Sequence, residues 1–133
     1  MSKKIINTSG KRKRAIARAT VKEGKALVKV NNIALSVYEP QMARLRIEEP
    51  LILAGDLANK LSISVNVKGG GVTSQADAAR LAIAKALAEY NESLRQVFLD
   101  YDRQLLVADV RRKETRKPNS HGKARAKRQK SYR

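Results

Sequence analysis

Basic residues concentrate at the two ends of this chain, and this distribution confines a folded core to the middle. Residues 1–18 carry seven basic and no acidic side chains, and residues 109–133 carry eleven basic and two acidic ones. Residues 19–108 carry eleven basic and ten acidic side chains, so they account for only +1 of the formal charge of +17. Concentrated like charge opposes a compact state unless a polyanion neutralises it. The distribution therefore predicts a globular domain over 15–108 between a basic N-terminal arm, 1–14, and an extended basic C-terminal tail, 109–133.

Nucleic acid is the polyanion that this pattern favours. An anionic membrane is the weaker alternative, because a membrane-surface helix needs an apolar face. The few apolar residues of the tail, such as Val110 and Tyr132, have no helical spacing. The chain has neither an apolar run near the roughly 18 residues that span a bilayer nor an apolar signal region. We expect a soluble cytoplasmic protein without a membrane partner.

Catalytic and metal-binding residues are scarce in the sequence. There is no cysteine and a single histidine, His121, which lies among the lysines and arginines of the tail. The pairs Glu48–Glu49 and Asp100–Asp102 have spacings at which side chains on one element do not face each other. These residues support no acid–base or nucleophilic site. We therefore expect no enzyme activity, cofactor, metal or small-molecule substrate.

Apolar residues with a period of two predict β-strands in two regions. Residues 15–31 alternate on both sides of a turn at Glu23-Gly24, which predicts a β-hairpin. Residues 61–67, "LSISVNV", alternate most clearly and predict a further strand. Between these regions, Pro40 and Pro50 each precede a short apolar segment, which predicts two short helices.

A long helix is predicted from Ser74 to about Leu99. Ser74 can cap its N-terminus, with Asp77 in a capping-box position. Its first half is rich in alanine, so another backbone can approach it closely, and residues 105–108 are expected to anchor the tail to the domain. The order β-β-α-β-α argues for an α+β fold with helices on one face of a sheet.

Three consecutive glycines, Gly69 to Gly71, separate the predicted strand from the long helix. One interpretation is a phosphate-binding loop, but neither the P-loop nor the dinucleotide-binding spacing is present, and Asp77 would repel a phosphate. A second is a sharp turn that needs positive φ angles. A third is a site where an RNA backbone approaches closely.

Three stretches together resemble one family, the universal small-subunit ribosomal protein nine family. They are "GKRKRAIARATVKEG" (10–24), "GGGVTSQADAARLAIAKAL" (69–87) and "QKSYR" (129–133), and the second is the most specific. The resemblance covers nearly the whole chain, and the ending is similar to the archaeal and eukaryotic branch. Within that branch we expect an archaeal source, because the chain is short and lacks extensions.

The resemblance implies a fold and a location. The fold is a two-layer α/β sandwich with a split β-α-β arrangement, as in the second domain of ribosomal protein five, plus the extended basic tail. The location is the head of the small subunit, on the 3′ major domain of its rRNA beside other head proteins. There the tail extends to the peptidyl-site tRNA.

The resemblance and the charge pattern together give two sets of expected contact residues. The resemblance alone implies the contacts with tRNA, at the end of the tail, at Lys130, Ser131, Tyr132 and Arg133. Contacts with rRNA are expected at Lys11, Arg12, Lys13, Arg14, Arg18, Gly69, Gly70, Gly71, Arg111, Arg112, Lys113, Arg116, Lys117, Lys123, Arg125, Lys127 and Arg128.

Two other functions stay open on the residues alone. One is a free double-stranded RNA-binding or architectural module, which would be expected to carry its charge on the folded surface. The other is an enzyme that uses the glycine loop, for which no catalytic residue is available.

Overall fold

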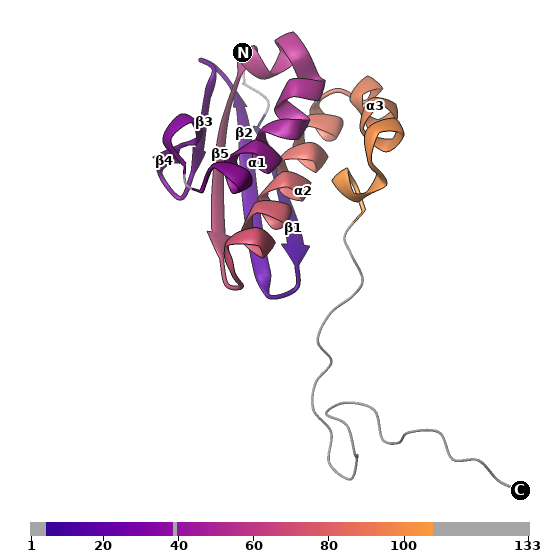
Figure 1. Cartoon of the computed structure of the whole chain (residues 1–133). Coiled ribbons are helices and arrows are strands. Elements are labelled where there is room, and N and C mark those ends of the chain that lie inside the picture. The colour runs from indigo at the N-terminus through magenta and orange to yellow at the C-terminus, as the bar shows by residue number, and fades with distance from the viewer. Residues whose placement is uncertain (1–4, 39, 108–133) are drawn as a thin grey trace, which may run out of the picture.

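Five strands form one mixed sheet in the computed structural model, which describes residues 5–38 and 40–107 (Figure 1). The order across the sheet is β1-β2-β5-β3-β4. The strands are β1 (Ile5–Arg12), β2 (Ala15–Glu23), β3 (Leu27–Val30), β4 (Ile33–Ala34) and β5 (Leu61–Lys68).

The hairpin predicted over 15–31 is wrong, although both of its strand segments exist. Strand β2 pairs antiparallel with β1 on one side and with β5 on the other. Strand β3 pairs parallel with β5, so β5 lies between β2 and β3. Alternation identified the strands, but it carries no information about which strand lies beside which.

The basic N-terminal segment also differs from the expected arm. Residues 5–12 are strand β1, which forms the actual hairpin with β2 through a turn at Lys13 and Arg14, where Lys13 has φ 54°. Ile6 and Gly10 are buried against the helices, whereas Lys11 is exposed. The sheet therefore begins before residue 15, because β1 can bury one face while Lys11, on the other face, stays in water.

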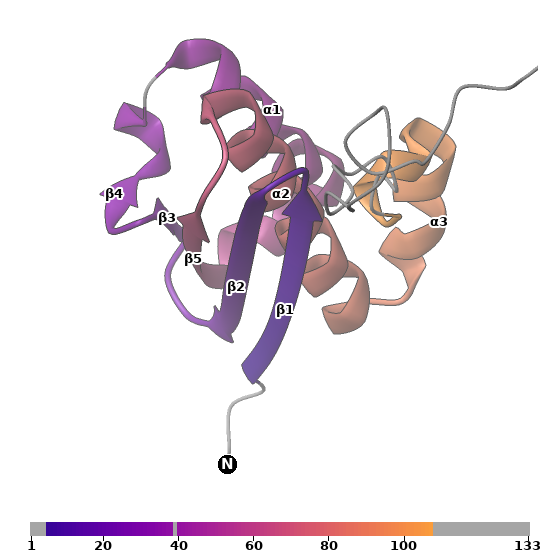
Figure 2. The same ribbon diagram turned by 90° about the horizontal axis from the view of Figure 1, so that it is seen from below.

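Helices cover one face of this sheet. Figure 1 shows α1 and α2 in front of the strands, with α3 beside them, and Figure 2 shows the same layering from below. The helices are α1 (Gln41–Ala54), α2 (Val72–Tyr90) and α3 (Ser93–Tyr101), joined by the short 3₁₀ segments η1 (Leu35–Val37), η2 (Gly55–Lys60) and η3 (Arg103–Leu105). The two-layer α+β sandwich is confirmed.

Helix α1 is continuous where two short helices were predicted. Pro50 lies inside it and is fully buried. A proline within a helix lacks the N–H that would bond to the carbonyl four residues earlier. Here the buried ring, next to the buried Ile47 on the same face, offsets that loss.

The predicted helix from Ser74 to Leu99 is two helices, and its cap is different. Gly71 occupies the N-cap of α2, and no side chain caps this end. The chain leaves the helix at Asn91, which is extended with φ −138° and ψ 105°. Asn91 Oδ1 accepts hydrogen bonds from Ser93 N at 3.1 Å and from Ser93 Oγ at 2.8 Å, and α3 begins there. The buried Leu94 and Phe98 still continue the apolar stripe.

The alanine-rich half of α2 packs directly on strand β1, as its composition predicted. A Cβ atom on Gly10 would lie 2.7 Å from Ala82 N and would also meet the Ala78 carbonyl oxygen. The two backbones are therefore in contact at Gly10. At the other end of the domain, Leu105 is fully buried and provides the expected anchor for the chain that leads to the tail.

Candidate nucleic-acid interface

Two turns meet at one end of the sheet, the β1–β2 turn and the glycine turn between β5 and α2. Gly69 has φ +79°, and a Cβ on it would lie 2.6 Å from the Arg14 carbonyl oxygen. Gly70 has φ +68°, and its Cβ would lie 3.1 Å from Ala15 Cβ. The interpretation of these two glycines as a sharp turn is confirmed, since both positions have a conformation and a close approach that favour glycine.

Exposed cations surround this junction. Strand register places Lys11 opposite Ile16, and Ile16 opposite Lys68, so the two lysines flank one position of β2. Lys13 and Arg14 form the adjacent turn, and all four cations are exposed. We call Lys11, Lys13, Arg14 and Lys68 the basic corner. The structure thus brings three of the expected rRNA contacts together beside the glycine turn and adds Lys68, which the sequence did not single out.

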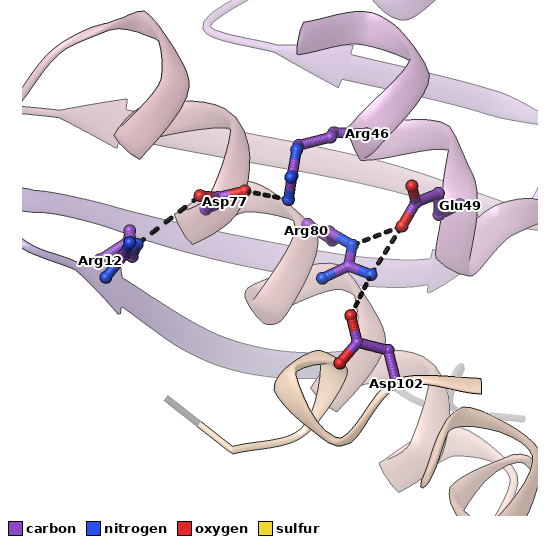
Figure 3. A network of polar contacts seen from close by, with 6 residues as sticks. All are labelled: Arg12, Arg46, Glu49, Asp77, Arg80 and Asp102. Atoms are coloured by element: carbon purple, nitrogen blue, oxygen red, sulfur yellow. Dashed lines mark hydrogen bonds and ion pairs between the residues drawn. The ribbon is translucent and has the colours of Figure 1, made fainter. Parts of the chain in front are cut away.

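Arg12, another expected rRNA contact, turns toward the helices. Its Nε lies 3.6 Å from Asp77 Oδ2, and Asp77 Oδ1 accepts a 2.8 Å hydrogen bond from Arg46 Nη1 (Figure 3). Asp77 therefore links β1, α2 and α1 rather than forming the predicted capping box. Its charge is shared between two guanidinium groups.

A second ion-pair group lies deeper in the helical layer. The buried Arg80 of α2 donates from Nε to Glu49 Oε2 at 2.8 Å and from Nη2 to Asp102 Oδ2 at 3.1 Å (Figure 3). Glu49 comes from α1, and Asp102 follows the last residue of α3. Glu49 and Asp102, which belong to the two carboxylate pairs of the sequence, therefore have a structural role.

The sheet face opposite the helices is basic. Its side chains are those that alternate with the buried residues of each strand, and no acidic residue is among the described ones. The exposed cations on this face are Lys11, Arg18, Lys22, Lys29 and Lys68. Between them lie the neutral polar residues Asn7, Ser9, Thr20, Ser62, Ser64 and Asn66. We call this surface the open face.

Most described acidic residues belong to the helical layer instead. They are Glu48, Glu49, Asp56, Asp77, Glu89, Glu92, Asp100 and Asp102. Glu23, at the end of β2, is also directed to that layer, because its Oε1 accepts a 2.8 Å hydrogen bond from Tyr90 Oη of α2. This hydrogen bond raises the pKa of the Tyr90 hydroxyl above its ordinary value. The near-neutral domain is therefore polarised: the described charged side chains of the open face are all cations, and the helical layer carries the described acidic side chains together with cations such as Arg46 and Arg80.

Lys22, Lys29 and Lys68 were not among the contact residues expected from the sequence, because charge was summed along the chain rather than by sheet face. The signal was available for Lys22 and Lys68, which occupy the phase opposite to the buried residues of β2 and β5. Arg18, an expected rRNA contact, lies among them on β2, opposite Asn66 of β5.

The expected contacts from Arg111 to Arg133 lie outside the described residues. Within the described ranges, no helix is long and apolar enough to cross a membrane, and no group of three or more potential ligands could hold a metal ion.

Comparison with known proteins shows the family. The model of the family described as ribosomal protein S9/S16 matches residues 10–133. "Small ribosomal subunit protein uS9" of Methanothrix thermoacetophila is 48% identical over 132 residues, which cover 98% of this chain and 99% of the relative. The protein of the same name from Methanococcus maripaludis is 47% identical over 133 residues, with the same two coverages. These are archaeal ribosomal proteins and not enzymes, so this chain belongs to the ribosomal protein S9/S16 family, in its archaeal type.

Proposed function

We propose that this ribosomal protein binds small-subunit rRNA in the head of the subunit, on the 3′ major domain. Its place is then the small subunit in the cytoplasm, beside other head proteins. Its C-terminal tail would extend to the peptidyl site and help to hold tRNA through Lys130, Ser131, Tyr132 and Arg133. Family membership supports the ribosomal role, and the basic corner supports RNA as the partner.

The basic corner is the observation that carries the rRNA proposal. Four exposed cations stand beside a glycine turn, and the exposed Gly71 has nothing within 4 Å of the position of a Cβ. A nucleic-acid backbone can therefore approach this surface closely. Arginine offers paired donors to a phosphate, and lysine offers a point charge. Such contacts fix orientation on the RNA without reading its sequence.

Binding of the full-length protein to a transcript of the 3′ major domain tests this proposal. A transcript of equal length from another rRNA domain is the control. The affinity should fall steeply with salt, because each neutralised phosphate contributes about 0.7–0.9 to the slope of log K against log salt concentration. Equal affinity for both transcripts, or a flat salt response, would contradict the proposal.

A free RNA-binding module is the second candidate, and one observation favours it. Such a module carries its charge on the folded surface, and the open face shows that this domain does so despite its small net charge. The two candidates differ in how the protein occurs in cells. A ribosomal constituent should co-sediment with small subunits after a high-salt wash, whereas a free module should be released.

A further inference from the structure

We propose that the open face of the sheet docks onto double-helical RNA through its sugar–phosphate backbone. This inference rests on the proposed rRNA binding and deepens it by naming the surface and the class of RNA. The basic corner is one end of this surface, since Lys11 and Lys68 belong to both. The strands β1, β2, β5 and β3 together provide it.

The cations of the open face are spread across the sheet rather than gathered at one point. Arg18 and Lys22 lie on β2, Lys29 lies on β3, and Lys11 and Lys68 lie on β1 and β5. Neighbouring strands are about 4.8 Å apart, so the four adjacent strands β1, β2, β5 and β3 span about 14 Å across the sheet. Such a spread can contact several phosphates at once, whereas a small anion would use one cluster.

Neutral polar side chains fill the space between the cations. Register aligns Ser9, Arg18 and Asn66 in one row across three strands. The next row holds Asn7 and Thr20, with a 2.9 Å hydrogen bond from Thr20 Oγ1 to Asn7 Oδ1. Hydroxyl and amide groups can bond to phosphate oxygens and to the ribose 2′-hydroxyl. No carboxylate among the described residues of this face repels the backbone.

The composition of the open face favours a double helix over a single strand. Proteins that bind single-stranded RNA stack its bases on aromatic side chains. The aromatic residues of the described chain lie outside the strands, at Tyr38, Tyr90, Phe98 and Tyr101. The exposed apolar residues of the face are Ile5, Ile16 and Leu27, which have no ring to stack. The open face therefore suits recognition of the RNA backbone and shape, which is how proteins bind double-helical RNA.

Two triple variants of the full-length protein test this inference. The open-face variant combines Arg18→Gln, Lys22→Gln and Lys29→Gln. The matched control combines Lys60→Gln, Arg95→Gln and Arg103→Gln. It removes three exposed cations of the helical layer, from η2, α3 and η3 respectively. Circular dichroism checks that both variants fold. Affinity is measured against salt for the 3′-major-domain transcript, an RNA duplex and a single strand of equal length.

The open-face variant should reduce the slope of log K against log salt by about two to three for the transcript and the duplex. The control should reduce it by less than one, and the single strand should respond less than the duplex. Wild-type binding with no difference between the two variants would overturn the open-face inference and leave the proposed function standing. A larger effect on the single strand would overturn the assignment to a double helix. Absence of wild-type binding to the transcript would instead reject the proposed function.

Lysine acylation gives a second readout that needs no variant. In the complex with the transcript, Lys22 and Lys29 should become protected while Lys60 stays reactive. Unprotected Lys22 and Lys29 in a saturated complex would contradict the inference. Protection only in complete subunits, and not with rRNA alone, would mean that another protein covers this face and would also contradict it.

Discussion

Arg80 binds two carboxylates from different elements, and its side chain is only 7% exposed. Arg80→Ala would leave Glu49 and Asp102 without this partner in a partly buried site. We expect the free energy of unfolding to fall by about 3 kcal/mol, the lower end for breaking a buried ion pair, because both carboxylates stay about a third exposed. Urea unfolding measures this change.

Arg95→Ala is the matched control for Arg80→Ala. Arg95 pairs with Glu92 at 3.3 Å, but both side chains are more than half exposed. The loss should be at most about 0.5 kcal/mol, as for other exposed helix pairs. Equal losses in the two variants would show that the Arg80 group does not hold the helices together.

The partners of Arg80 could not be predicted from the sequence. They lie 31 and 22 positions away along the chain, so local spacing rules do not reach them. The role of Asp77 could not be predicted from local spacing either. Its position fitted a helix cap, but its carboxylate pairs with Arg12 and Arg46 from other elements. Glycine positions were more informative, since the run of glycines predicted a turn that needs positive φ, and Gly69 and Gly70 have it.

At the level of elements, the contact between β1 and α2 leads to a sharp prediction. Gly10→Ala should lower stability by about 1–3 kcal/mol or more, because the new Cβ would meet the backbone of α2, which cannot rotate away. Gly24→Ala is the control, since its Cβ would lie at an ordinary 3.8 Å from Ser62 Cβ. Thermal and urea unfolding compare the two, and similar stability would contradict the close packing at Gly10.

Strand segments and the α+β class could be predicted, whereas pairings and helix breaks could not. The period of two identified β2 and β5 by their buried faces. The position of β5 between β2 and β3 depends on contacts across the whole sheet. The break at Asn91 depends on its side-chain bonds to Ser93, and the continuity of α1 depends on the burial of Pro50. Each was decided by tertiary structure against a local signal.

For the whole molecule, the polarised domain explains why a net charge of +1 over residues 19–108 was a poor guide to the site. Among the described residues, the open face carries cations without acidic side chains, whereas the helical layer carries the acidic side chains together with cations such as Arg46, Arg80 and Arg95. The sum along the sequence cancels two surfaces that point in different directions. Three residues of the basic corner, Lys11, Lys13 and Arg14, were predictable because they are nearly consecutive in the chain, whereas Lys68 joins them only through the pairing of β2 with β5.

The proposed contact between the end of the tail and tRNA is also a property of the whole molecule. Deletion of residues 130–133 should weaken tRNA binding in the peptidyl site by about tenfold, the equivalent of one charge-assisted contact of roughly 1.5 kcal/mol, while the protein still enters subunits. Filter binding of tRNA to reconstituted subunits measures this loss. A length-matched variant with Lys130→Gln and Arg133→Gln should lose nearly as much, if charge is the cause. Unchanged tRNA affinity in both would contradict the role proposed for the end of the tail.

The position of β5 between β2 and β3 also determines the order in which the sheet can form. The β1–β2 hairpin is local, but β3 has only the two-residue β4 as a neighbour until residues 61–68 are available. The side chain of Asn31, at the end of β3, then bonds to Val67 of β5, 36 positions away. Its Oδ1 accepts a hydrogen bond from Val67 N at 2.8 Å, and its Nδ2 donates one to the Val67 carbonyl at 3.2 Å. Pairing between such distant segments slows folding, because the chain loses the entropy of loop closure before the new strand contacts stabilise it. In pulse-labelled hydrogen exchange, we expect β3 amides to gain protection only together with those of β5, later than the hairpin.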